Sequence, residues 1–193
     1  FHASYVGHML REFPDARVIH IIRDPRSTIL SLRDMPWAPR SWILNNRYLH
    51  RLAKEVAPHR DKIHEVRLED LLTEPEREMR AILEFVDEPW DERVLDHTKH
   101  APLDDVPPFP WLLTATKARG STPKRDWRER IPPAWIRQIE MRNAVYFDSY
   151  GYERAVLEEE PSFFDRMRAV FADFSEARRF LVRFIPLARK LGS

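Results

Sequence analysis

Cysteine is absent from this chain of 193 residues. Its absence excludes disulfide bonds, thiolate metal sites and a cysteine nucleophile, and it fits a reducing compartment. The sequence also lacks any run of about 18 apolar residues, the length that a membrane-spanning helix needs. No signal peptide is evident. We therefore expect a cytoplasmic protein.

Glycine is scarce, with only Gly7, Gly120, Gly151 and Gly192 in the chain. None of the four belongs to a glycine-rich phosphate loop of either common type. The first residue is Phe1 rather than methionine, and the sequence opens directly in a helical pattern. We expect the natural start of the protein to lie upstream.

The composition is that of a soluble globular protein, with 43% hydrophobic and 33% charged residues. A chain of this length can bury one sizeable core but is short for two domains. The formal net charge is only +1. The chain therefore has no overall attraction to nucleic acid, and we expect no nucleic-acid partner.

The most informative stretch begins with the short apolar run Val18–Ile22, which is β-branched apart from His20. This pattern predicts a strand that is buried on both faces. Asp24 can cap the helix that follows, and Pro25 suits its first position. Arg23 then lies at the carboxyl end of the strand, which is where ligands bind in open α/β sheets.

A helix N-terminus attracts anions, and the arginine fork matches a phosphate or a carboxylate. Ser31 lies one turn beyond Ser27 on the same helix face. We therefore predict that Arg23 and Ser31 bind an anion, with phosphate the first choice. The alternative is a surface pair between Arg23 and Asp24 at the end of a strand.

The rest of the chain reads as helices around one further strand, followed by a long irregular segment. The alternation in 63–68 predicts the second strand, and 101–133 holds many prolines and little periodicity. We expect helices over residues 3–12, 27–33, 40–56, 75–86 and 89–97, a helix that begins at 132, and one or two helices over 163–191.

Several side chains allow two interpretations from the sequence alone. Glu69 and Asp70 at the end of the second strand are either a general base or a turn and helix cap. Trp37 either lines an acceptor pocket or packs on a helix. His97 and His100 have the i, i+3 spacing of metal ligands but lack a clear third ligand, so we expect no metal site.

The residues 23–31, Arg-Asp-Pro-Arg-Ser-Thr-Ile-Leu-Ser, resemble the 3′-phosphate motif of PAPS-dependent sulfotransferases. In that family an arginine and a serine eight residues apart hold the 3′-phosphate of the nucleotide. Residues 13–20 resemble the family's approach to this strand. Residues 66–71 with the following helix resemble its later strand–helix unit, although Leu68 stands where the family often has a tyrosine near the adenine.

The resemblance implies a three-layer α/β/α fold of the P-loop NTPase-like type, with a mostly parallel central sheet and a helix-rich C-terminal half. Residues 1–155 would form the sulfotransferase-like domain, and residues 156–193 a C-terminal helical extension. The family's N-terminal strand and loop for the 5′-phosphosulfate have no counterpart in this sequence, so the chain alone should be inactive.

The resemblance also implies further site residues. Arg119-Gly120 and Asp126-Trp127-Arg128 look like a stretched form of the family's C-terminal nucleotide-binding loop. Arg119, Lys124 and Arg125 would close over the nucleotide as a cationic flap. His2 stands close to the position of a catalytic histidine in some members and is the candidate base. No metal is required.

The function implied is transfer of a sulfuryl group from PAPS to a hydroxyl or amine of an acceptor, which is a small molecule, carbohydrate or lipid. One alternative is a P-loop kinase relative that moves phosphate from ATP. Another is a non-catalytic nucleotide- or anion-binding relative. The amphipathic, basic C-terminal stretch predicts a homodimer contact in preference to membrane contact.

Overall fold

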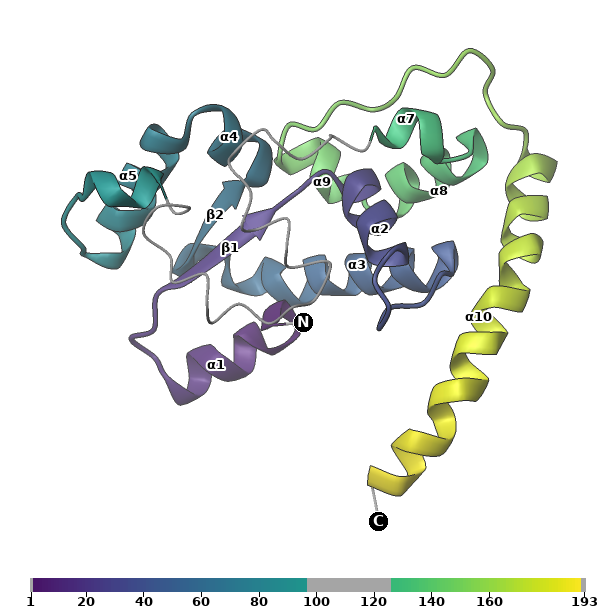
Figure 1. Ribbon diagram of the computed structural model, residues 1–193, viewed down its shortest axis with the longest axis horizontal. Coiled ribbons are helices and arrows are strands. Elements are labelled where there is room, and N and C mark those ends of the chain that lie inside the picture. The colour runs from purple at the N-terminus through teal and green to yellow at the C-terminus, as the bar shows by residue number, and fades with distance from the viewer. Residues whose placement is uncertain (1, 97–125, 192–193) are drawn as a thin grey trace. The chain divides into compact units, whose positions relative to one another are not determined.

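The computed structural model describes residues 2–96 and 126–191 and divides the chain into two compact units. Unit 1 is built from Phe1–Arg23 and Val56–Arg125, and unit 2 from Asp24–Glu55 and Asp126–Ser193. The described residues form a mostly helical α/β protein with a helix-rich C-terminal half (Figure 1). The helix-rich character of the C-terminal half agrees with the prediction from the sequence.

Unit 1 contains the sheet of the described residues. β1 (Val18–Ile22) pairs in parallel with β2 (Ile63–Arg67), in a register that sets Val18 opposite Ile63 and Ile22 opposite Arg67. Both predicted strands and the parallel pairing are therefore confirmed. Two strands make up the sheet in the part of the chain that the structure describes.

Helix α1 (Val6–Glu12), preceded by the 3-10 helix η1 (His2–Tyr5), covers one face of this sheet. Val6 and Leu10 are four residues apart and therefore share a helix face, with which they pack on Val56 and Ile63. Gly7 lies against His59 of the 3-10 helix η2 (Ala57–Lys62), where a β-carbon would come within 2.8 Å of the ring.

The other face of β1 differs from the prediction. Ile19 and Ile21 are 39% and 55% exposed, so the strand is not buried on both faces. On that face the helix α5 (Pro75–Val86) packs over β2, where Phe85 stacks on His64 at 5.3 Å. On this face of the sheet α5 therefore covers β2 and leaves β1 exposed. A hydrophobic run in the sequence does not show which faces of a strand a neighbouring element covers.

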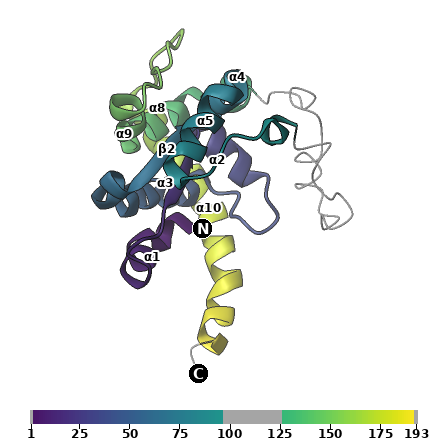
Figure 2. The same ribbon diagram turned by 90° about the vertical axis from the view of Figure 1, so that its left-hand side faces the viewer.

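Helices α4 (Leu68–Thr73) and α5 lie side by side in unit 1 (Figure 2). α5 ends at Asp87, which adopts a left-handed φ of 64°. Arg17 donates to the Phe85 carbonyl at 2.6 Å and to the Asp87 carboxylate at 2.7 Å, which closes this helix end. The helix predicted over 89–97 is only a short 3-10 helix, η3 (Glu92–Leu95), within the described residues.

Unit 2 consists of helices. They are α2 (Pro25–Arg33), α3 (Trp42–Val56), α7 (Trp127–Arg130), α8 (Pro133–Arg142), α9 (Ala144–Ser149) and α10 (Phe163–Leu191). α2 packs on α7 and α8, and α10 packs on α8. The buried side chains of this unit include Ile29, Leu30, Trp42, Leu49, Trp127, Ile131, Trp135, Ile136, Ile139 and Tyr146.

Helices of this unit begin where the sequence supplies a cap. Pro133 opens α8 at its first turn, and the side chain of Asp126 accepts a hydrogen bond from the backbone N–H of Arg128 in α7. None of the helices in residues 2–96 and 126–191 has the length and apolar character that a membrane crossing requires.

Candidate functional site

The N-terminus of α2 has the local structure that the sequence predicts. The Asp24 side chain accepts a hydrogen bond from the backbone N–H of Arg26 at 2.8 Å, and Pro25 occupies the first helical position. Thr28 donates its hydroxyl to the Asp24 carbonyl at 3.0 Å. The turn between strand and helix is therefore determined by residues 24–28 themselves.

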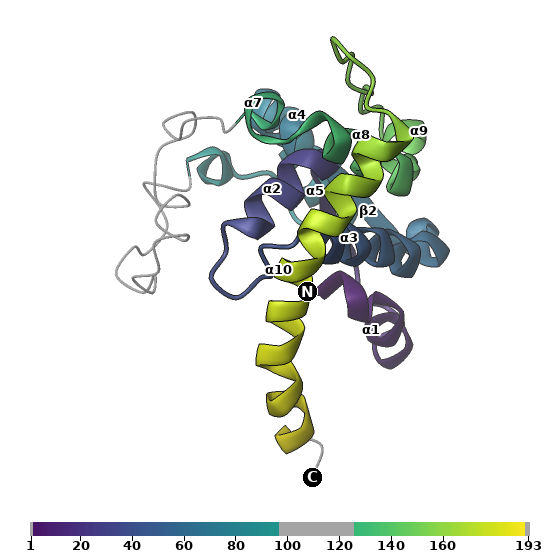
Figure 3. The same ribbon diagram turned by 90° about the vertical axis from the view of Figure 1, so that its right-hand side faces the viewer.

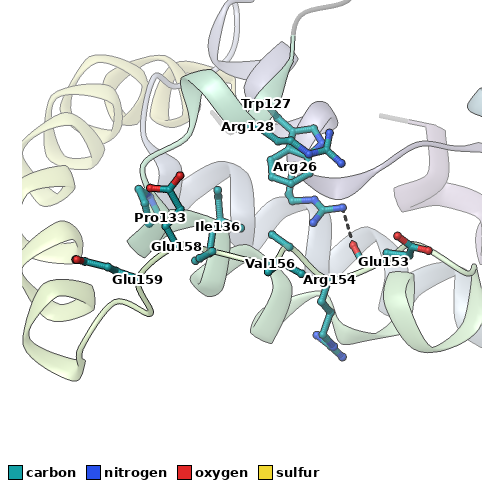
Figure 4. Close-up of a pocket in the computed structure, with 12 residues that line it drawn as sticks. Arg26, Trp127, Arg128, Pro133, Ile136, Glu153, Arg154, Val156, Glu158 and Glu159 are labelled. Atoms are coloured by element: carbon teal, nitrogen blue, oxygen red, sulfur yellow. Dashed lines mark hydrogen bonds between the residues drawn. The ribbon is translucent and has the colours of Figure 1, made fainter.

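Arg26 in this turn is buried, with an exposed fraction of 3%. Its guanidinium donates to the Asp24 carboxylate at 2.7 Å, to the Glu140 carboxylate at 2.7 Å and to the Glu153 carbonyl at 2.9 Å, the last of which is dashed in Figure 4. A buried arginine needs such compensation because an unpaired charge in the interior is costly. Arg26 is therefore a structural cation that joins α2 to α8.

Aromatic rings complete the environment of Arg26. Its guanidinium carbon lies 3.9 Å from the centroid of the Trp127 ring and 5.1 Å from that of Phe147. Arg128 approaches the Trp127 ring as well, at 4.4 Å. Cation–π contacts of this kind are strongest where water is excluded. Trp127 of the Asp-Trp-Arg segment therefore packs against the first turn of α2.

The two residues of the predicted 3′-phosphate motif belong to different units. Arg23 follows β1 directly, at the carboxyl end of the strand in unit 1, and is half-buried. Ser31 lies in α2 of unit 2, and its half-buried hydroxyl makes no hydrogen bond within the described residues. The hydroxyl of Ser27, one turn earlier, is also without a hydrogen bond there.

Other predicted site residues lie at the edge of the described chain or beyond it. His2 begins η1, but the structure describes only its backbone. Gly120 and the three flap residues Arg119, Lys124 and Arg125 lie outside the described residues, as do His97 and His100. These assignments therefore stay predictions from the sequence.

Glu69 and Asp70 lie in the first turn of α4, with Arg67 Nε 3.7 Å from an Asp70 carboxylate oxygen. Acidic side chains at this end of a helix are stabilised by its dipole. Their position therefore supports the helix-start interpretation over that of a general base. Trp37, in the loop after α2, is 42% exposed.

A pocket of about 630 Å³ lies within unit 2, next to the Arg26 cluster (Figure 4). Pro133, Ile136 and Val156 give it an apolar wall, and its charged residues include Glu158 and Glu159. The guanidinium of Arg26 is already bound by two carboxylates, and the rest of the lining carries charges of both signs, since it also includes Arg128 and Arg154. Residues 153–159 lack a periodic pattern, and no signal in the sequence therefore indicates this pocket.

Comparison with known proteins finds similarity in the first part of the chain. Residues 1–92 match the sulfotransferase family. The resemblance noted in residues 13–31 and 66–85 is thus confirmed over the segment that holds β1, α2 and β2. Arg23 and Ser31 both lie inside the matched segment.

Two relatives match about half of the chain. An uncharacterized protein of Aquifex aeolicus (strain VF5) is 33% identical over 110 residues, which cover 50% of this chain and 14% of that protein. A protein-tyrosine sulfotransferase of Drosophila melanogaster is 28% identical over 103 residues, which cover 47% of this chain and 20% of that protein. The chain thus spans less than a quarter of the length of either relative.

Proposed function

We propose that this protein transfers a sulfuryl group from PAPS to a hydroxyl or amine of an acceptor. The observation that carries the proposal is the match of residues 1–92 to the sulfotransferase family. It is supported by the capped turn after β1, which sets Arg23 at a strand end and begins α2 with Asp24 and Pro25. Both features suit recognition of a phosphate.

Within this proposal Arg23 and Ser31 bind the 3′-phosphate of the nucleotide. The donor fits these residues in one respect, since the Ser31 hydroxyl is uncommitted within the described chain and can donate to a phosphate oxygen. PAPS supplies the activated sulfuryl group when it is bound. Arg119, Gly120, Lys124 and Arg125 close over the nucleotide, and His2 takes the proton of the acceptor.

The fold and the partners belong to the same proposal. The parallel pair β1–β2 would be part of the central sheet of a three-layer α/β/α fold, with residues 1–155 as the sulfotransferase-like domain and 156–193 as an extension. The acceptor is a small molecule, carbohydrate or lipid. The formal net charge of +1 argues against nucleic acid as a partner.

The test is calorimetric titration of the chain with adenosine 3′,5′-diphosphate and, separately, with ADP. We expect the 3′,5′-diphosphate to bind more tightly, because only it carries the 3′-phosphate. Arg23→Ala should weaken its binding by about 1.5–3 kcal/mol, the usual cost of a hydrogen bond to a charged group. This cost corresponds to a loss in affinity of about 10- to 150-fold.

Two matched variants control this experiment. Arg11→Ala removes an exposed arginine from α1 and should leave the affinity unchanged. Ser27→Ala removes the hydroxyl one turn before Ser31 and should affect binding less than Ser31→Ala does. Equal affinity for both nucleotides would favour a kinase-like or general anion-binding relative, and an unchanged affinity in Arg23→Ala would overturn the proposed motif.

A further inference from the structure

Helix α10 carries an exposed aromatic face that nothing in the proposed sulfuryl transfer uses. The large hydrophobic side chains that are exposed on its described part are Phe163, Phe164, Phe171, Phe174 and Val182, each between 61% and 80% exposed. At about 100° per residue these five positions fall within one sector of the helix about 100° wide. We call them the aromatic face of α10.

A different side of α10 attaches it to its own unit. The carboxylate of Asp173 is 6% exposed and accepts hydrogen bonds from the Ser41 hydroxyl at 2.6 Å and from the backbone N–H of Trp42 at 2.9 Å. Ala177, one turn later, is buried as well. Because these two positions fix the rotation of the helix, the aromatic face is held outward while α10 packs on α8 (Figure 3).

The exposed area is larger than a solvated helix needs to carry. Phenylalanine side chains of roughly 200 Å² each, at these exposed fractions, leave on the order of 500 Å² of aromatic surface in water. Soluble monomers rarely expose more apolar surface than this in one patch, and such patches usually mark a contact with a protein or a membrane. The size of the aromatic face therefore indicates that it contacts a partner.

The distribution of charged residues along α10 indicates which kind of partner the aromatic face would contact. Residues 177–191 contain five basic residues and no acidic residue, namely Arg178, Arg179, Arg183, Arg189 and Lys190. Residues 163–176 contain two arginines and three acidic residues, one of which, Asp173, is bound to α3. In a dimer through α10, the basic segment 177–191 would therefore face either the same basic segment or the nearly neutral segment 163–176 of the second copy. Neither segment would neutralise its charge. The exposed Arg178 falls within the same sector of α10 as the aromatic face, so an anionic surface that covers this face would compensate its charge.

We propose that α10 lies on the surface of a bilayer that contains anionic lipid. The aromatic face enters the boundary between headgroups and acyl chains, and the basic second half of the helix lies among the anionic headgroups. Phenylalanine on one face together with arginine and lysine is typical of helices that lie in this interface. The interaction is peripheral, in line with the lack of a membrane-crossing helix among the described residues.

The test is sedimentation of the full chain with two kinds of vesicle, one of phosphatidylcholine alone and one of equal parts phosphatidylcholine and phosphatidylserine. We expect binding to the second kind, and weaker binding as salt screens the charges. Phe164→Ser combined with Phe171→Ser should reduce the affinity on the order of tenfold per phenylalanine. Arg178→Glu should reduce it on the anionic vesicles.

The controls are Val156→Ser, which changes an apolar residue that is 99% exposed outside α10, and Arg142→Glu, which reverses an exposed charge on α8. Both should bind vesicles like the unchanged chain. Circular dichroism should show all variants folded, because the substituted side chains lie in solvent. Equal binding to both vesicles, or binding that the phenylalanine variants do not alter, would overturn the proposal. So would a concentration-dependent dimer without vesicle binding, which would assign the aromatic face to a second copy.

Discussion

Two arginines three residues apart have different roles in this protein. Arg23 is half-buried at the end of β1, whereas Arg26 is buried beneath Trp127 and is bound by two carboxylates. The sequence alone does not distinguish them, because both belong to the same short polar segment, Arg-Asp-Pro-Arg. The distinction matters for mutagenesis, because a substitution at Arg26 would damage the fold, while one at Arg23 tests the proposed phosphate contact.

Glu140 shows how strongly unit 2 depends on this buried charge. Its carboxylate, 1% exposed, accepts hydrogen bonds from Arg26, from Arg137 and from the backbone N–H of Ala155. We predict that Glu140→Ala lowers the free energy of unfolding by about 3–5 kcal/mol, because it removes one of the two carboxylates that compensate the buried charge of Arg26. Urea denaturation measures this change.

Glu160 provides the control for Glu140, since it also pairs with Arg137 but its side chain is 62% exposed. Glu160→Ala should cost far less, because water screens an exposed ion pair. A loss for Glu140→Ala no larger than that for Glu160→Ala would show that the cluster does not depend on the buried carboxylate.

At the scale of elements, α3 is capped by a residue far away in the sequence. Asp173 accepts hydrogen bonds from the Ser41 hydroxyl and from the first backbone N–H groups of α3, at 2.9 Å for Trp42 and 3.0 Å for Ile43. We predict that Asp173→Asn destabilises unit 2 by about 2 kcal/mol, since the amide removes the charge and offers only one acceptor.

Hydrogen exchange measures the effect of Asp173→Asn directly, through faster exchange at the first turn of α3. Glu176→Gln changes a carboxylate of the same helix that pairs with Arg179 near the surface, and it should leave that exchange unchanged. Unaltered protection in Asp173→Asn would mean that the cap contributes little to holding α3 and α10 together.

The start of α10 has a reciprocal cap of its own. The Ser162 hydroxyl and backbone N–H both donate to the Asp165 carboxylate, and the Asp165 N–H donates to the Ser162 hydroxyl. The hydrogen bond from the Ser162 side chain, followed by that from its backbone, lowers the pKa of Asp165 below its ordinary value of 3.8. The serine and the acid three residues later form a capping box.

Because this pKa is lowered in the folded state, the cap stabilises the helix above pH 3.8 and is lost as the pH falls through the lowered value. We predict that an NMR titration places the Asp165 pKa below 3.8 and that Ser162→Ala moves it upward. A pKa that does not move in Ser162→Ala would contradict the capping box.

At the scale of the whole molecule, charge and similarity to known proteins are unevenly distributed. The formal net charge is +1, yet residues 177–191 carry five basic residues and no acidic ones. The family match covers residues 1–92, which contribute to both units, whereas the helices from α7 onward lie outside it. The proposed 3′-phosphate motif, Arg23 with Ser31, thus belongs to the first half of the chain, and the proposed membrane surface to its end.

The sequence by itself determined the local features of this protein. The strand Val18–Ile22, the Asp24 cap and the proline-led helices depend on residues within a few positions of one another, so propensity and spacing reveal them. The resemblance in residues 23–31 likewise lies within one continuous stretch. For that reason the sequence alone was enough to predict the sulfotransferase family.

The tertiary structure decided the features that join distant residues. Arg26 meets Glu140 across 114 positions, and Ser41 meets Asp173 across 132. No local pattern signals these pairs, because which charge is buried depends on how the helices pack. The same holds for the exposed Ile19 and Ile21 and for the aromatic face of α10. A hydrophobic pattern shows that a side chain is apolar, but only packing determines whether another part of the chain covers it.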